Sequence, residues 1–138
     1  MKSRIQILKL PDGGSRGENC FTVPPLVLSC LGQIRDIYIA PVAPGAIRGN
    51  HFHLRRKEAL IILYETEWVL YWDEGENTPT CQIRFLGAGA RVILVEPGSS
   101  HAVRNTGTRE LLLLGLFSES YDPTESLRRE LISVPALP

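Results

Sequence analysis

Apolar residues recur along this chain in short runs, which turn-forming residues interrupt at intervals of roughly 8–12 residues. The runs predict strands over residues 4–10, 26–31, 34–40, 48–53, 58–64, 67–73, 81–86, 91–96, 100–105 and 110–118. The turn signals between them are Pro11-Asp12-Gly13-Gly14, Pro44-Gly45, Asp73-Glu74-Gly75, Pro97-Gly98 and Asn105-Thr106-Gly107. Short strands at this spacing indicate an all-β sandwich or barrel.

Two of the predicted strands, 58–64 and 110–118, are apolar on both faces rather than alternating. A strand of this kind is covered on both sides. The second cover is either another layer of the same chain or the surface of a partner subunit, and the second alternative predicts a homodimer.

The C-terminal region has a different pattern, in which Asp122-Pro123-Thr124-Glu125 carries the signals of a helix start. Asp is a favoured N-cap residue, and Pro is favoured at the first helical position. The pattern predicts one short helix over residues 123–132, with Leu127 and Leu131 on its apolar side and an end at Pro135.

Length and composition narrow the class of protein. A chain of 138 residues with 43% hydrophobic and 22% charged residues predicts one folded domain over 1–138. Its 15 basic and 15 acidic residues balance, which argues against a nucleic-acid partner, and no apolar run is long enough to span a membrane. Three cysteines outside any CxxC pair, together with an N-terminus unlike a signal peptide, favour a cytoplasmic protein with reduced thiols.

The three histidines of the chain form the most informative pattern. His51 and His53 lie two residues apart on a predicted strand, so their side chains project from one face. A tight turn over residues 54–57 would bring Glu58 beside them, and Pro97-Gly98 would deliver His101 at the start of another strand. Imidazole nitrogens and a carboxylate suit one divalent ion, with Zn, Mn, Fe or Ni left open. The alternative is a metal-free site in which the histidines act as acid, base or hydrogen-bond donor.

These spacings resemble the two sequence motifs of the cupin superfamily, over about residues 34–118. The segment Gly45-x5-His51-x-His53-x4-Glu58 is similar to the first cupin motif, and Gly98-x2-His101-x3-Asn105 is similar to the second. Glu65 and Glu96 depart from the motifs, at positions where cupins have Gly and Pro. The resemblance implies a double-stranded β-helix, or jelly-roll, barrel, here with the short C-terminal helix. It also implies that His51, His53, Glu58 and His101 bind the metal.

A narrower resemblance concerns Arg48-Gly49-Asn50-His51-Phe52-His53, which is similar to cupins that act on nucleotide-linked sugars. It implies that Arg48 binds a phosphate and that His51 is a catalytic base, with Tyr38 or Tyr64 as the acid. Trp68 and Trp72 alternate on one strand and either pack in the core or form an aromatic wall for substrate. The basic run 55–57 is either a solvated turn or the rim of an anion site.

The function that these patterns favour is metal-dependent isomerisation or epimerisation of a sugar or nucleotide sugar. A metal would polarise a carbonyl while a histidine moves the neighbouring proton. Two alternatives stay open, namely an iron-dependent dioxygenase and a non-catalytic module that binds a sugar or another metabolite.

Overall fold

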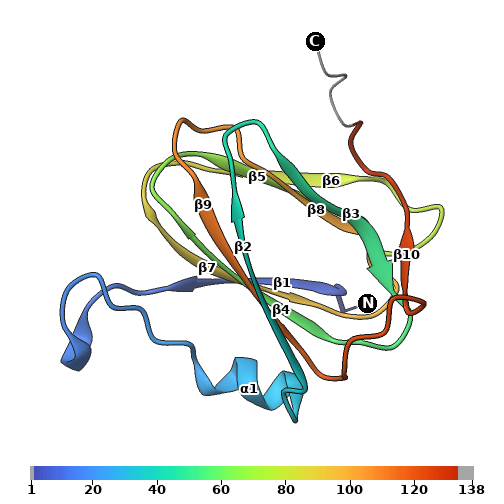
Figure 1. Ribbon diagram of the computed structural model, residues 1–138, viewed down its shortest axis with the longest axis horizontal. Helices are drawn as coiled ribbons and strands as arrows, with labels where there is room; N and C mark the ends of the chain where they lie inside the picture. Colours follow the sequence, from blue (N-terminus) through green and yellow to red (C-terminus); the bar gives the residue numbers. More distant parts are fainter. Residues whose placement is uncertain (1, 134–138) are drawn as a thin grey trace.

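The computed structural model describes residues 2–133 and consists of two five-stranded antiparallel sheets that face each other (Figure 1). The first sheet contains, in order, β1 (Ile5–Leu10), β7 (Gly89–Val95), β4 (Glu58–Tyr64), β9 (Leu111–Phe117) and β2 (Asp36–Val42). The second contains β10 (Ser126–Arg128), β3 (Ile47–His53), β8 (His101–Arg104), β5 (Trp68–Trp72) and β6 (Cys81–Phe85). This arrangement confirms the predicted all-β jelly roll.

The predicted strand over residues 26–31 is wrong, because this segment is the helix α1 (Pro25–Leu31). Pro25 lies in the first turn, and the N–H of Gly32 caps the last turn by donating to the carbonyl of Leu28 at 3.0 Å. Val27 and Leu31 are one helical turn apart and pack on the outer face of the first sheet. A short 3-10 turn, η1 (Gly14–Arg16), precedes it. Among the described residues, no helix has the length and apolarity to cross a membrane.

The outer face of the first sheet has two parts. Helix α1 and the N-terminal segment cover the part nearest β7, where Ala59 and Val92 are fully buried. The part nearest β2 is open, and Ile39 is 67% exposed there. Residues 2–133 therefore provide the second cover for one half of this face and leave the other half uncovered.

The predicted helix over residues 123–132 is also wrong. Asp122 does act as a local cap, because its Oδ1 accepts a hydrogen bond from the backbone N–H of Thr124 at 2.9 Å. The chain then extends as β10, which pairs antiparallel with residues 51–53 of β3. A helix of about ten residues is marginal by itself, and the strand ladder outcompetes it. Pro135 lies outside the described residues.

The core lies between the two sheets and is most apolar at the end of the barrel where β4 finishes and β5 begins. Trp68 is 0% exposed, and its ring stacks on that of Phe85 with centroids 4.4 Å apart. Tyr64 packs edge-on against Trp68 at 5.6 Å. Of the two interpretations of Trp68, core packing is the one that the structure supports.

Candidate metal and substrate site

Four side chains converge at the end of the barrel opposite Trp68. His51 and His53 lie on β3, while Glu58 is the first residue of β4 and His101 the first of β8. One potential ligand atom from each residue lies within 4.8 Å of the others. His53, Glu58 and His101 are buried, and His51 is half-buried. The cluster therefore has the composition and proximity that the sequence predicted.

The strand register explains why these residues meet. His51 is the cross-strand partner of His101, so the two imidazoles project from the same face with centroids 5.0 Å apart. The turn before β8 is fixed to β3, because the N–H of Gly98 donates to the carbonyl of His53 at 2.8 Å. Glu58 follows the short turn after β3 and enters the cluster from the other sheet.

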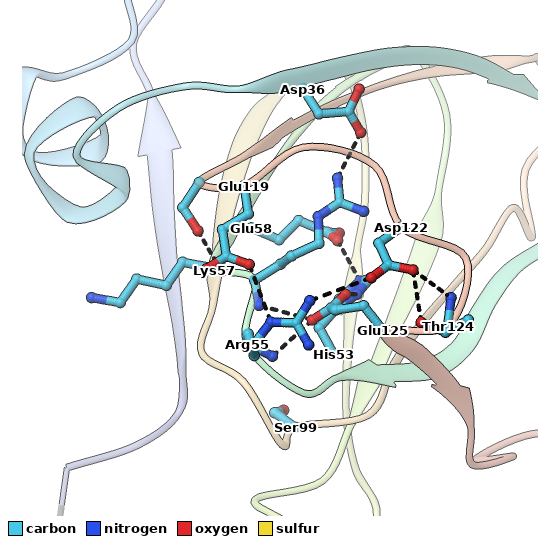
Figure 2. A network of polar contacts seen from close by, with 12 residues as sticks. Asp36, His53, Arg55, Lys57, Glu58, Ser99, Glu119, Asp122, Thr124 and Glu125 are labelled. Atoms are coloured by element: carbon cyan, nitrogen blue, oxygen red, sulfur yellow. Dashed lines mark hydrogen bonds and ion pairs between the residues drawn. The ribbon is translucent and has the colours of Figure 1, made fainter.

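The hydrogen bonds of His53 determine which of its ring nitrogens is free. Nδ1 lies 2.8 Å from a carboxylate oxygen of Glu125, an acceptor, so Nδ1 carries the hydrogen (Figure 2). In a neutral imidazole this leaves the lone pair on Nε2, which lies 3.0 Å from Oε2 of Glu58. His101 repeats the arrangement: Nδ1 is 3.3 Å from the carbonyl of Ser99, and Nε2 is 3.3 Å from Oε1 of Glu58.

Acceptor atoms therefore face one another in a buried space. Within residues 2–133, neither Nε2 of His53 and His101 nor either carboxylate oxygen of Glu58 has a hydrogen-bond partner. Buried acceptors without donors are costly. A divalent cation between them, or protons on both imidazoles, would satisfy all of these atoms. The nitrogen and oxygen donors fit Zn, Mn, Fe or Ni.

The pKa shifts suit a ligand role for His51, whereas they favour the charged forms of both His53 and Glu58. Burial, followed by the charge of the neighbouring His101, lowers the pKa of His51 to about 4, so the imidazole is neutral at pH 7. Burial opposes ionisation of Glu58, yet the imidazoles of His101 and His53 hold its pKa below the usual value. For His53, contacts with Glu58 and Glu125 outweigh burial and raise the pKa.

A β-bulge in β3 adds Arg48 to the same face. Arg48 pairs with Val103 and His51 pairs with His101, while Asn50 is the extra, unpaired residue with a φ of 62°. In an unbroken strand, residues three apart face opposite sides of the sheet. The bulge therefore turns Arg48 toward the face that carries the histidines.

The cluster borders a cavity of about 280 Å³ that contains Tyr38, Arg48 and His51 in its wall. The same three residues line an adjoining outer hollow of about 580 Å³, which also touches Arg56. Together the two spaces have the size of a small-molecule site. Burial, followed by the charge of Glu58, raises the pKa of Tyr38, so its hydroxyl stays protonated at neutral pH.

Three of the residues predicted to touch substrate lie elsewhere. Tyr64 lies at the apolar end of the barrel, where its hydroxyl is 3.3 Å from Nε of Arg91. Trp68 is enclosed in the core. Trp72 is the cross-strand neighbour of His101 on β5, but it is not among the residues that line the 280 Å³ cavity or the outer hollow.

Sequence reasoning missed two residues near the histidines. Glu125 was interpreted as part of a helix start, although its side chain contacts His53. Arg56 belongs to the basic run 55–57, yet it is only 3% exposed and stacks over Phe117 at 3.5 Å. Its Nη2 lies 2.6 Å from Oδ2 of Asp36, and its side chain lines the outer hollow. Arg56 is therefore not a solvated surface charge. Nothing in the local pattern distinguishes Arg56 from its neighbours.

Solved structures of similar fold include enzymes that act on sugars. The dTDP sugar isomerase from Desulfovibrio desulfuricans matches with a TM-score of 0.73 and 18% identity, over 96% of this chain and 89% of that one. The 3,4-ketoisomerase QdtA from Thermoanaerobacterium thermosaccharolyticum matches at 0.69 and 20% identity, over 94% and 90% of the two chains. The capsular polysaccharide assembling protein CapF from Staphylococcus aureus matches at 0.62 and 18% identity.

The match to CapF covers 72% of this chain but only 28% of that protein. A search of curated proteins gives no match to the chain. The family described as the polysaccharide biosynthesis C-terminal domain matches residues 30–126, which contain all four clustered side chains. The chain therefore belongs to the polysaccharide biosynthesis C-terminal domain family, and its fold is that of the cupin superfamily.

Proposed function

We propose that this protein is a divalent-metal-binding cupin enzyme that isomerises or epimerises a nucleotide-linked sugar. The observation that carries the proposal is the set of facing acceptors on Glu58, His53 and His101, beside a cavity lined by Tyr38 and Arg48. The similar structures support the substrate class, since QdtA has been crystallised with TDP and with TDP-4-keto-6-deoxyglucose. ChmJ, a 3'-monoepimerase, has been crystallised with dTDP-quinovose.

His51, His53, Glu58 and His101 would hold the ion, which when bound supplies a Lewis acid for a carbonyl oxygen. His51 lines both the cavity and the outer hollow, whereas His53 lines the hollow alone and His101 the cavity alone, so His51, when it does not ligate the ion, would be the imidazole best placed to move a proton from the carbon next to a ketone. Tyr38, which stays protonated, would donate to the oxygen on which charge develops. Arg48 would hold a phosphate of the substrate.

The function is tested by following a ketosugar in deuterated water. Incubation with TDP-4-keto-6-deoxyglucose should give an isomer that carries deuterium next to the carbonyl, as measured by NMR. Tyr38→Phe should slow incorporation by about 10²–10⁴-fold, whereas Tyr64→Phe, which removes a hydroxyl at the other end of the barrel, should not. No incorporation by the metal-loaded protein would contradict this substrate. Oxygen consumption with Fe(II) would favour a dioxygenase instead.

The role of Arg48 is tested by the affinity for TDP, measured by calorimetry. Arg48→Ala should weaken binding about 10–100-fold, because charge-assisted hydrogen bonds contribute roughly 1.5–3 kcal/mol. Arg84→Ala is a matched control, since Arg84 is an exposed arginine on β6 that pairs with Glu67. Equal affinities of the two variants for TDP would remove Arg48 from the substrate site.

We also propose that the protein is a homodimer, formed through the open part of the first sheet. Cross-strand neighbours on β2, β9 and β4 make one apolar patch there, in which Ile61 and Leu114 are partly buried and the other members are exposed: Ile39, Pro41, Leu63 and Leu112. An exposed apolar patch on an edge strand is a typical association surface. Ile39→Glu should convert the dimer to a monomer in sedimentation experiments, and a monomeric wild type would contradict the proposal.

A further inference from the structure

The last described residues, 122–133, form a segment that we name the C-terminal strap, and polar contacts tie it to the barrel. Nε and Nη2 of Arg129 donate to the two carboxylate oxygens of Asp73 at 2.7 Å each. The guanidinium also stacks over Phe52 at 4.3 Å. At the far end, Oδ1 of Asn50 accepts from the backbone N–H of Leu131 at 3.0 Å. The strap is therefore anchored on the C-terminal side of β10.

Glu125 is a residue of the strap whose side chain contacts His53, a member of the candidate metal-binding cluster (Figure 2). Its side chain is 0% exposed. Oε1 accepts from Nδ1 of His53 at 2.8 Å, while Oε2 accepts from the backbone N–H groups of Arg55 at 2.7 Å and Arg56 at 2.8 Å. The backbone of the loop between β3 and β4 thus fixes the carboxylate of Glu125, and this carboxylate fixes the imidazole of His53.

We propose that Glu125 is a positioning residue, which holds His53 with its Nε2 lone pair toward Glu58 and so couples metal affinity to docking of the C-terminal strap. The inference rests on the metal site of the proposed function. A carboxylate that accepts from the far nitrogen of a ligating histidine fixes the tautomer and ring orientation and makes the imidazole a better donor. Without Glu125, His53 would also populate the tautomer with hydrogen on Nε2, which cannot bind an ion.

Coupling of this kind is reciprocal. If a docked strap favours the ion, the bound ion must favour the docked strap by the same factor. Zinc should therefore slow hydrogen exchange at the amides that donate to Glu125, those of Arg55 and Arg56, and along residues 126–128 of β10.

The test measures the Zn(II) affinity of the full chain by competition with a chromophoric chelator. Glu125→Gln should weaken it about 10–100-fold, because the amide has one oxygen and cannot serve both His53 and the two backbone N–H groups. Glu119→Gln is the matched control. It also removes a carboxylate from the chain that follows β9, but Glu119 is half-exposed and, within residues 2–133, forms an ion pair with Arg55 alone, at 3.4 Å. The control should bind zinc like the wild type.

Two further readouts separate positioning from a purely structural role. Nitrogen-15 NMR of the metal-free protein should show hydrogen on Nδ1 of His53 in the wild type and a mixture of the two tautomers in Glu125→Gln. Hydrogen exchange of the wild type, which needs no variant to fold, should show slower exchange of the strap with zinc. The inference is overturned if wild type and Glu125→Gln bind zinc equally, or if zinc leaves exchange of the strap unchanged. A wild type that binds no zinc at all would instead remove the metal site of the proposed function, and the inference with it.

Discussion

The two ends of the barrel are built from the same strands but differ in chemistry. Strand β4 begins at Glu58 among imidazoles and ends at Tyr64 among aromatic rings. Strand β5 runs the other way, from the enclosed Trp68 to Trp72 beside His101. At the aromatic end the buried groups are mostly apolar, whereas at the histidine end buried acceptors face one another.

The two ends of the barrel contribute differently to the stability of the fold. Burial of large apolar side chains favours folding, while buried polar atoms without partners oppose it. The aromatic end can therefore offset the cost of a histidine end that is organised for a ligand. If so, substitutions at the two ends should affect different measurements.

The largest expected effect on stability is that of Trp68→Ala. Removing a fully buried indole that stacks on Phe85 should lower the free energy of unfolding by about 3–5 kcal/mol. Urea denaturation measures this loss. The zinc affinity of the protein that stays folded should change less than about threefold, because distant sites are nearly independent. A large loss of affinity would mean that the two ends are not separable.

His101→Ala should have the converse effect. Loss of a ligand should weaken zinc binding by more than about 100-fold, beyond the effect of an outer-shell change. Zinc at 100 times its dissociation constant should raise the unfolding free energy of the wild type by about 2.7 kcal/mol, and this gain should be absent in the variant. Metal analysis and thermal unfolding with and without chelator measure both effects. Undiminished zinc content would disprove the assigned ligand set.

Gly49→Ala tests the bulge that joins Arg48 to the histidine end. Gly49 has a φ of 107°, and a Cβ there would collide with the carbonyl oxygen of His101. Gly45→Ala is a matched control, because Gly45 also has a positive φ of 83° but no atom within 4 Å of the added Cβ. Backbone strain should cost each variant about 1–3 kcal/mol. Only Gly49→Ala should cost more, and equal costs would show that the close approach is unimportant.

The smallest effect is expected for Tyr64→Phe. The hydroxyl makes one long contact, 3.3 Å to Nε of Arg91, and the ring stays packed against Trp68. Urea denaturation should therefore give a change of less than about 1 kcal/mol. A larger loss would indicate that the aromatic end also depends on a polar contact.

The alternation of residues was sufficient to predict most of the strands and the shared face of His51 and His53. The turns before Glu58 and His101, together with the resemblance to the cupin motifs, predicted that these two residues would join them, and the structure brings the four together. Metal binding itself stays a prediction. These inferences succeeded because they depend on local periodicity and on turns that Gly and Pro specify.

The failures have a different physical origin. Residues 26–31 are too short for periodicity to separate helix from strand, although Pro25 and Gly32 carried the helix signals. At Asp122 the capping signal was real, but pairing with β3 overrode it. Glu125 could not be assigned to His53, because a contact between residues 72 positions apart depends on the tertiary fold and not on local sequence.

The extra residue at Asn50 also has a consequence for how this family varies in length. If Asn50 were deleted from β3, the strand would lose its bulge and alternate regularly. Arg48 and His51 would then be two positions apart and would still face the same side of the sheet. The shortened chain would, however, lose the side-chain amide of Asn50, which forms hydrogen bonds with the backbone of Leu131 and Ile132. In homologues, a one-residue gap at this position is therefore expected to accompany a truncated or divergent chain terminus, with the arginine retained.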